Sequence, residues 1–257
     1  MVPVTANASA SSALTRLDLL RVGLRCLFFQ GLLHVRGMQN LSLMHALAPV
    51  VAKLDRDGSK KLLSKHLQFF NCNPNFAPLV AGGVLRLEAE RLLGTAVTDQ
   101  DVAHFKKAVS SPLAAMGDML FMGTIKPMAL TLACIFAIYN SFTGLVITWL
   151  LYNGVVVTCR LWGVYFGFRR GWEFVNVFSG SAFPRLLAIV QSIGASVGGA
   201  LLAVVLYRAA REGTWQEVVS VATIIVAVTM LRRDGSAPRL ALLLLPLCVL
   251  VALVSPG

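Results

Sequence analysis

The sequence predicts an all-α protein that crosses a membrane several times, and three observations support this prediction. Apolar residues make up 56% of the 257-residue chain, and its mean hydropathy is +0.72. Met128 to Cys159 holds no charged residue and exceeds the roughly 20 residues that a helix needs to cross a bilayer. Charges in the second half stand in short islands between apolar runs, as in the loops of polytopic membrane proteins. We expect an amphipathic N-terminal helix, interrupted or re-entrant hairpin segments and several C-terminal transmembrane helices.

Charge and cysteine patterns exclude several other classes of protein. The net charge of +11 comes from 23 Lys and Arg against 12 Asp and Glu, but no basic stripe with interleaved aromatic residues indicates a nucleic-acid site. The five cysteines are widely spaced and form no CxxC pair, so neither a disulfide framework nor a metal site is expected. We therefore expect a lipid bilayer as a partner, no nucleic acid and no cofactor.

The expected domain organisation is simple. Residues 1–14 are small and polar and predict a mobile tail, and 15–257 are expected to form a single membrane domain. Within it, 15–127 should hold amphipathic and broken helices, and 128–257 the transmembrane part.

A helix is expected to begin at Arg16. Thr15 and Asp18 have the spacing of a capping box, in which each side chain bonds the backbone N–H of the other residue. The basic face of this helix suits anionic headgroups at the cytoplasmic surface. Pro49 is expected to end the element, because proline disrupts a helix interior.

The next expected helix is short and ends at a break. Asp55 to Gly58 predicts a turn, and Ser59 is expected to cap a helix that runs to Phe70. The run NCNPN at 71–75 must break this helix, because the residue before a proline is pushed out of the α region.

Two more helices precede the most unusual stretch. One is expected over 77–93, stopped by Gly94, and another from Thr98, whose spacing to Asp101 repeats the capping box. The second is expected to run to Val109.

The stretch from Ser110 to Pro127, SSPLAAMGDMLFMGTIKP, holds two prolines, two glycines, one acid and one base. A continuous helix is not expected here, because proline removes a backbone donor and glycine weakens helix interiors. The stretch is also too apolar for a solvated loop. Broken apolar backbone with isolated ionisable groups is tolerated near a membrane only inside protein or a wet cavity, and transporters hold solutes at such segments.

The remainder predicts the membrane spans. The interruption at 140–144 divides Met128–Cys159 into two packed helices or a hairpin. Leu186–Tyr207 is an uninterrupted span, whereas Glu217–Leu231 and Leu240–Val254 are shorter and predict marginal spans or the halves of a hairpin.

The text PLAAMGDMLFMGTIKP at 112–127 resembles the P-L-A-G-x-G-D-x-x-F-W-G-T-x-[RK]-P signature of IID subunits of mannose/fructose/sorbose-type sugar phosphotransferase systems. Four more blocks resemble the same family in the same order: LTRLDLLRVGLRCLFFQG (14–31), MQNL (38–41), KHLQFFNCNP (65–74) and CRLWGVYFGFRRGWEFV (159–175). The likeness covers residues 14–180, and beyond them it rests on hydropathy.

The resemblance implies an all-helical, multi-pass subunit of the bacterial inner (plasma) membrane. It would pair with a IIC subunit, assembled as a trimer of heterodimers, to bind and translocate a hexose. The cytoplasmic IIB protein would phosphorylate the sugar with phosphate that passes from phosphoenolpyruvate through IIA. Because IIA and IIB carry the phosphoryl group in this family, the subunit would be non-catalytic.

The chain departs from the family where W-N-F-E-R-M-Q is usual. It reads LHVRGMQ at 33–39, so the usual Asn, Glu and Arg are His34, Arg36 and Gly37. A neutral amide and an acid thus give way to two groups that can carry positive charge. An alternative function therefore stays open: a non-transporting IID that regulates or scaffolds phosphotransferase proteins.

Four residues are candidate sugar contacts. Asp118 either caps a helix by accepting backbone N–H bonds or faces a sugar hydroxyl in a wet cavity, and the two roles can coexist. Lys126 either contacts the substrate or extends to the membrane interface. The amides of Gln39 and Asn71 can donate and accept, which suits polyol recognition, although amides near helix breaks are also ordinary turn residues.

His66 is the side chain best suited to carry a phosphoryl group, because histidine is phosphorylated in the soluble subunits of such systems. The resemblance argues against that role, since IID subunits carry no phosphoryl group. We expect a hydrogen-bonded histidine at a helix end, and no catalytic residue. Three arginines are expected to anchor loops or contact headgroups: Arg160, Arg169 and Arg170.

Overall fold

The computed structural model describes residues 14–54, 56–173 and 180–212. Over these residues the chain is helical, with isolated β-bridges but no strand. Three helices are long and apolar enough to cross a membrane: Asp99–Ile138, Phe142–Glu173 and Ala182–Ala209. The expected all-α membrane fold is therefore confirmed.

Some expected features lie outside the described residues. These are residues 1–13 of the tail and the two marginal spans at 217–231 and 240–254. Leu14, the last residue of the expected tail, is described and is buried in the hydrophobic core.

The capping box at the first helix is confirmed. Asp18 N donates to Thr15 Oγ1 over 3.2 Å, and Thr15 N donates to Asp18 Oδ2 over 2.9 Å, so α2 spans Arg16–Cys26. Lys53 Nζ also lies 2.5 Å from Asp18 Oδ2. This ion pair ties the start of α2 to the residues that follow α3.

The expectation that Pro49 ends a helix is wrong, because Pro49 lies inside α3 (Asn40–Val51). A proline leaves the carbonyl four residues earlier without its helical donor. That carbonyl belongs to His45, and it accepts a hydrogen bond of 3.2 Å from Arg25 Nη1 on α2. A neighbouring helix thus satisfies the group that the proline leaves open.

The next helix is displaced from its expected position. α4 spans Arg56–His66, so it begins before Ser59 and ends before Phe70. Ser59 lies inside this helix and donates its hydroxyl to Val51 O at 3.1 Å, so it is not a cap. The break at 71–75 is confirmed, since this segment is non-helical up to a turn that leads into the next helix.

α5 begins and stops close to the expected signals, whereas α6 begins where expected but runs past Val109, its expected end. α5 spans Ala77–Leu92, and Gly94 takes the positive φ of 74° that favours glycine after a helix. α6 begins at Asp99 behind the confirmed capping box of Thr98 and Asp101.

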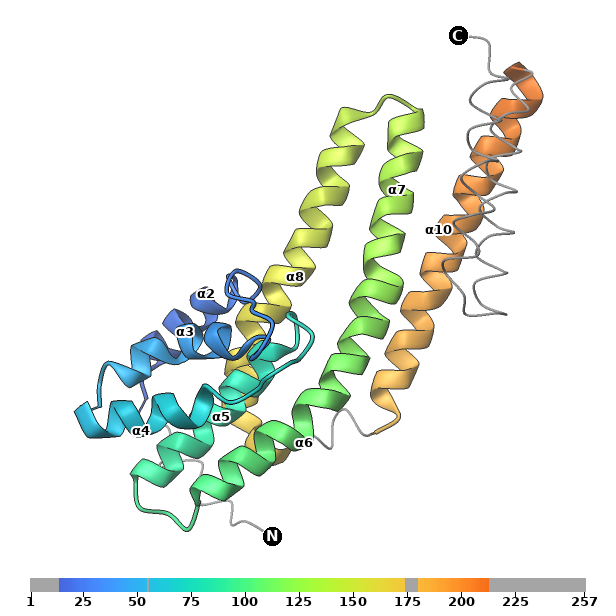
Figure 1. Ribbon diagram of the computed structural model, residues 1–257. Helices are drawn as coiled ribbons and strands as arrows, with labels where there is room; N and C mark the ends of the chain where they lie inside the picture. The colour runs from blue at the N-terminus through green and yellow to red at the C-terminus, as the bar shows by residue number, and fades with distance from the viewer. Residues whose placement is uncertain (1–13, 55, 174–179, 213–257) are drawn as a thin grey trace.

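The expected break within Ser110–Pro127 is wrong. α6 (Asp99–Gly117) passes without interruption into η1 (Asp118–Ile125), a π-helix, and then into α7 (Lys126–Ile138). Figure 1 shows this single helix bending upward between α6 and α7. In an apolar setting a true break would leave backbone N–H and C=O groups without hydrogen-bond partners. Local π-helical geometry and hydroxyl side chains can supply these partners, so prolines and glycines are tolerated within the helix. Thr124 shows the effect, since its Oγ1 donates to Met119 O at 3.0 Å.

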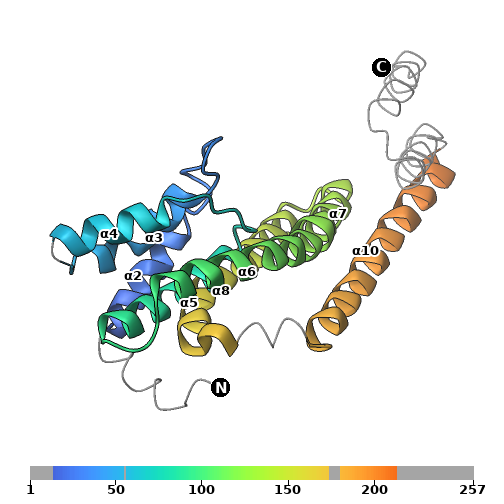
Figure 2. The same ribbon diagram turned by 60° about the horizontal axis from the view of Figure 1, so that its bottom comes forward.

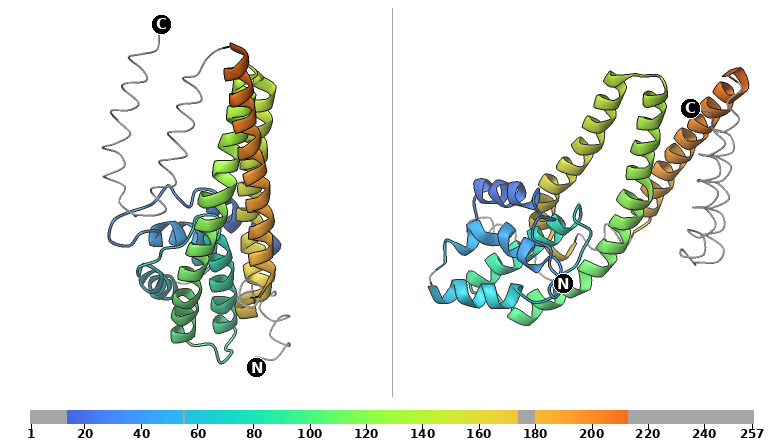
Figure 3. Two further views of the ribbon diagram at one scale, coloured as in Figure 1. Left: turned by 90° about the vertical axis from the view of Figure 1, so that its right-hand side faces the viewer. Right: turned by 45° about the horizontal axis from the view of Figure 1, so that its top comes forward.

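The expected division of the uncharged run is confirmed. α7 turns at 139–141 into α8 (Phe142–Arg170), and Asn140 has a positive φ of 53° at this turn. After the short 3-10 turn η2 (Gly171–Glu173), the chain continues in α10 (Ala182–Glu212), which contains the expected span Leu186–Tyr207. The long helices α7, α8 and α10 run side by side (Figure 3), and α10 packs on α7 and η1.

The core lies where the smaller helices α2 to α5 pack against α6 and the lower half of α8 (Figures 1 and 2). The closest approach is between α5 and α8, and glycines make it possible. A Cβ on Gly82 would lie 2.2 Å from Val164 O, and one on Gly167 would lie 2.1 Å from Leu79 O. Small residues let two backbones approach closely, as in membrane helix pairs.

This packing predicts opposite effects for two glycine substitutions in α8. Gly167→Ala should lower stability by about 1–3 kcal/mol, because the new methyl group must displace backbone atoms of α5. Gly154→Ala is the matched control, since nothing lies within 4 Å of its added Cβ, and it should be neutral or stabilising by up to about 1 kcal/mol. Thermal unfolding in detergent measures both changes. Equal midpoints for the two variants would contradict the proposed close contact.

Candidate functional site

The loop at residues 71–75, NCNPN, joins the parts of the fold that meet at the start of the transmembrane region. Its central residue, Asn73, is buried. The Nδ2 of Asn73 donates to Asp118 Oδ1 at 2.8 Å, and its Oδ1 accepts from Asn75 N at 2.9 Å. Its carbonyl accepts from the N–H groups of Phe76 and Ala77 at the start of α5. One residue therefore orders the loop, begins α5 and contacts the first residue of the π-helix.

Gly117 makes the contact between Asn73 and Asp118 possible. A Cβ at position 117 would lie 2.4 Å from Asn73 Cβ and 2.5 Å from its Cγ. No side chain fits between the loop and this helix, so glycine is required by close approach rather than by a special backbone angle, its φ being −65°.

Gln39 holds the same loop from the other side. Its Oε1 accepts a hydrogen bond of 3.1 Å from Cys72 N, and its own backbone N–H donates to Phe70 O at 2.8 Å. The Gln39 side chain is buried, with 4% exposed. The structure thus places this predicted site residue beneath the 71–75 loop.

Arg160 on α8 makes the third connection. Its Nε donates to Asn75 Oδ1 at 3.0 Å, and its Nη1 donates to Leu27 O at 2.7 Å. The residue is buried, with 9% exposed. The expectation that Arg160 anchors a loop is therefore confirmed, whereas the alternative of a headgroup contact is wrong, because its guanidinium joins the 71–75 loop to the end of α2 inside the protein.

Asp118 does not cap a helix, since its backbone is α-helical and helix continues on both sides. It is exposed, and Asn73 donates to one of its carboxylate oxygens. Among the residues that the structure describes, none donates a hydrogen bond to the other oxygen. A carboxylate held by one buried amide and open on its second side can accept a hydrogen bond from a hydroxyl group.

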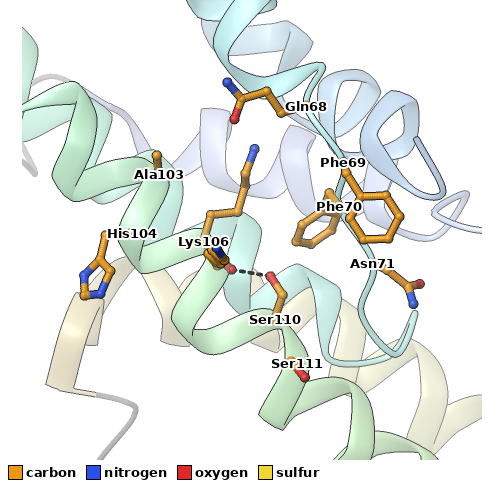
Figure 4. A pocket seen from close by; sticks show the side chains of 10 residues that line it. Gln68, Phe69, Phe70, Asn71, Ala103, His104, Lys106, Ser110 and Ser111 are labelled. Carbon is orange, nitrogen blue, oxygen red and sulfur yellow. Dashed lines mark hydrogen bonds between the residues drawn. The ribbon is translucent and has the colours of Figure 1, made fainter. Parts of the chain in front are cut away.

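Asn71 and Lys126 line two different cavities. Asn71 is exposed at the edge of a cavity of about 520 Å³ between α6 and the residues that follow α4 (Figure 4). Lys126 is exposed on α7, roughly two turns beyond Asp118, and lines a cavity of about 500 Å³ between α7 and α8. Gln39 and Asp118 thus both meet the 71–75 loop, Asn71 belongs to it, and Lys126 stands apart.

The contacts around the 71–75 loop also involve residues that sequence reasoning missed. Asn73 and Asn75 were visible in NCNPN only as parts of a break, and Arg160 only as a charge between apolar runs. The usable signal was the charge itself, since an arginine at the end of a long apolar run is costly to bury without partners. Among the described residues, no group of three His, Cys, Asp or Glu could hold a metal ion.

The unusual residues at 34–37 form a packed turn. The ring nitrogens of His34 lie 2.7 Å from Asn40 Oδ1 and 3.3 Å from Gly37 N. A Cβ on Gly37 would lie 2.2 Å from Asn40 Nδ2. His34 and Gly37 therefore support one another through Asn40, while Arg36 is exposed.

His66 is the hydrogen-bonded helix-end histidine that was expected. It is the last residue of α4, is 1% exposed, and its Nε2 lies 3.0 Å from Glu88 Oε1. Burial lowers the pKa of His66 below its ordinary value, and this outweighs the opposing effect of its hydrogen bond to Glu88. Burial by itself would raise the pKa of Glu88, but hydrogen bonds from His66, Lys65 and Arg91 lower it to about 2. A neutral imidazole that donates to a carboxylate fits both directions.

This pair predicts that mild acid destabilises the protein through His66. Below its ordinary pKa of 6.5, unfolded His66 binds a proton that the buried residue resists, so stability falls as the pH falls from about 7 to about 5, by up to about 1.4 kcal/mol per pH unit. The Glu88 contribution is lost only between its ordinary pKa of 4.5 and about 2, so it does not enter this window.

Thermal midpoints measured across the window check the prediction. His66→Gln keeps a donor for Glu88 but cannot titrate, so its slope should be smaller than that of the wild type. His104→Gln is the matched control and should keep the wild-type slope. An unchanged slope in His66→Gln would contradict the assignment.

Comparison of the sequence with known proteins identifies a family and several relatives. The family model for the mannose/fructose/sorbose family IID component of the phosphotransferase system (PTS) matches residues 13–225. Over 201 residues the chain is 30% identical to the PTS mannose-specific EIID component of Escherichia coli K12, which covers 77% of this chain and 71% of that protein. It is 24% identical over 191 residues to the fructose permease IID component of Bacillus subtilis 168, covering 74% and 70%.

Solved structures agree with the sequence comparison. The chain is similar to a protein in the cryo-electron microscopy structure of the mannose transporter ManYZ in complex with microcin E492. The TM-score is 0.60 at 30% identity, with 73% of this chain and 70% of that chain covered. A second membrane-protein structure matches with a TM-score of 0.68 at 30% identity and the same coverage. The chain therefore belongs to the mannose/fructose/sorbose family of phosphotransferase IID components.

Proposed function

We propose that this membrane subunit pairs with a IIC subunit in the bacterial inner membrane to bind and translocate a hexose, which a cytoplasmic IIB protein phosphorylates. In this proposal the chain crosses the membrane several times and is itself non-catalytic. Family membership supports the permease role, and the similarity to a protein in the ManYZ transporter structure supports the IIC partner. IIA would supply IIB with phosphate.

The exposed carboxylate of Asp118 is the observation on which the sugar-binding role depends. It stands at the first position of a π-helix inside a helix long enough to cross a membrane. Short π-helical segments in α-helices often occur at functional sites. Asn73 fixes one oxygen at 2.8 Å, which leaves the other free to accept a sugar hydroxyl through a charge-assisted hydrogen bond.

The other candidate residues take different roles in this proposal. Gln39 is buried and its Oε1 already accepts from Cys72 N, so we assign it the task of positioning the 71–75 loop beneath Asp118. Asn71 is exposed on that loop, and its amide can both donate to and accept from a polyol. Lys126 is exposed farther along the same helix, where its flexible side chain suits either a substrate oxygen or the membrane interface.

The outer faces of the long helices supply surface for lipid and for a membrane partner. α8 exposes large apolar side chains along its first half and again near its end: Phe142, Ile147, Trp149, Leu150, Leu151 and Trp162. Extensive exposed apolar surface marks a membrane or protein contact. This surface suits a IIC subunit embedded in the same bilayer.

Substitution of Asp118 tests the sugar-binding role. Asp118→Asn keeps an acceptor for Asn73 but removes the charge, so assembly with IIC should be normal. Sugar affinity should fall roughly tenfold, since a charge-assisted hydrogen bond exceeds a neutral one by about 1–1.5 kcal/mol. Asp57→Asn is the control, because Asp57 is an exposed acid on α4 that makes no contact with the 71–75 loop or Asp118 among the described hydrogen bonds.

Uptake of labelled hexoses, together with co-purification of IIC, measures both properties. Wild-type uptake by Asp118→Asn would reject the pathway role of Asp118. If deletion of the gene leaves uptake unchanged, the subunit regulates or scaffolds phosphotransferase proteins instead.

The proposal also predicts that no phosphoryl group is carried by this subunit. His66 is 1% exposed and bonded to Glu88, so an attacking Nε2 is not accessible to a phosphoprotein. Incubation of the reconstituted system with labelled phosphoenolpyruvate should label IIA and IIB alone. Acid-labile label on this chain that disappears in His66→Gln would overturn the non-catalytic assignment.

A further inference from the structure

The cavity of about 520 Å³ between α6 and the end of α4 is lined by basic and aromatic side chains that, Asn71 aside, have no part in the proposed sugar binding. Figure 4 shows its two sides: α6 contributes Lys106, and the segment after α4 contributes Phe69 and Phe70. Lys107 and Ser111 of α6 line it as well, and none of its lining residues is acidic.

Lys106 is buried and lacks a partner. Only 6% of the residue is exposed, and its Nζ makes no hydrogen bond within the described parts of the chain. An ammonium group removed from water without a partner is strongly unfavourable. In Figure 4 this side chain lies in the cavity that Gln68 borders from the opposite side. The unpartnered Nζ of Lys106 therefore lies in a cavity that is large enough to hold a ligand.

The charges around the cavity are not balanced. The nearby Lys65 and Arg91 are paired with Glu88 and Asp99, at distances of 2.5 to 3.3 Å. Lys106 and Lys107 are in no ion pair with a described acid. Two basic side chains are thus left without a described acidic partner on one side of the cavity, and in their protonated form they match the charge of a phosphate monoester, which approaches −2 near neutral pH.

We propose that this cavity binds a phosphate monoester. The phosphate of this ligand accepts hydrogen bonds from the ammonium groups of Lys106 and Lys107. The cavity is larger than inorganic phosphate alone requires, and Phe69 and Phe70 offer an apolar wall for an organic part. The site shares Asn71 with the proposed sugar contacts, but it goes beyond them, because Asp118 and Lys126 do not line it. The same chemistry exists in a soluble sugar phosphate and in the headgroup of phosphatidic acid.

The first experiment uses the full-length chain in detergent. Thermal midpoints are measured against increasing inorganic phosphate and glycerol phosphate, with sodium chloride at equal ionic strength as the salt control. We expect a saturable rise in the wild type, and an apparent Kd at least roughly tenfold weaker in Lys106→Met, which keeps side-chain length but removes the charge. Lys61→Met removes one exposed lysine charge from α4, outside the cavity, and should bind as the wild type does.

A second measurement separates the two sources of phosphate. The chain is reconstituted in phosphatidylcholine with and without phosphatidic acid, and retained lipid is counted by native mass spectrometry. Saturable binding of glycerol phosphate without retained phosphatidic acid identifies a soluble ligand, and the reverse result identifies a lipid. If neither compound affects the wild type beyond the salt control, the proposal is overturned without any variant. It is overturned as well if Lys106→Met and Lys61→Met respond equally.

Discussion

The contact between Asn73 and the helix at Gly117 and Asp118 is the constraint on which the rest of this structure depends. One buried amide orders the 71–75 loop, begins α5 and holds the carboxylate of Asp118 at 2.8 Å. The absence of a side chain at position 117 lets the loop approach this closely. α5 packs on α8, and Asp118 begins the π-helix between α6 and α7. The loop therefore sets the position of α8 and of the continuous helix α6–η1–α7 relative to the smaller helices.

A mainly apolar chain gains its specificity here from a few buried polar groups. Apolar packing has little directional preference, whereas each buried donor or acceptor requires a partner at a defined distance. Arg160 meets this requirement by bonding Asn75 and Leu27 O, and Gln39 does so by accepting from Cys72 N. These bonds converge on the same loop. The candidate site therefore lies at the point where the fold is most strongly specified.

Local signals in the sequence were reliable where a few neighbouring residues decide the structure. The capping boxes at Thr15 and Thr98 and the positive φ of Gly94 follow from such short-range chemistry. Predictions failed where a distant group changed the outcome. Pro49 continues a helix because Arg25, on another helix, bonds the carbonyl of His45 that the proline leaves open. For Arg160 the sequence left a loop contact and a headgroup contact open, because the partners that decide between them lie 85 and 133 positions away.

The sequence by itself determined the all-α membrane class, the helix starts and the family, because hydropathy, capping spacing and motif order are properties of the chain alone. It also singled out Asp118 as an isolated acid in apolar surroundings. Only the tertiary structure decided that Ser110–Pro127 is a continuous helix with a π-helical segment, and that Asn73 holds Asp118. The physical reason is that prolines and glycines break a helix only when nothing else satisfies its backbone. Whether something does depends on the side chains that folding brings nearby.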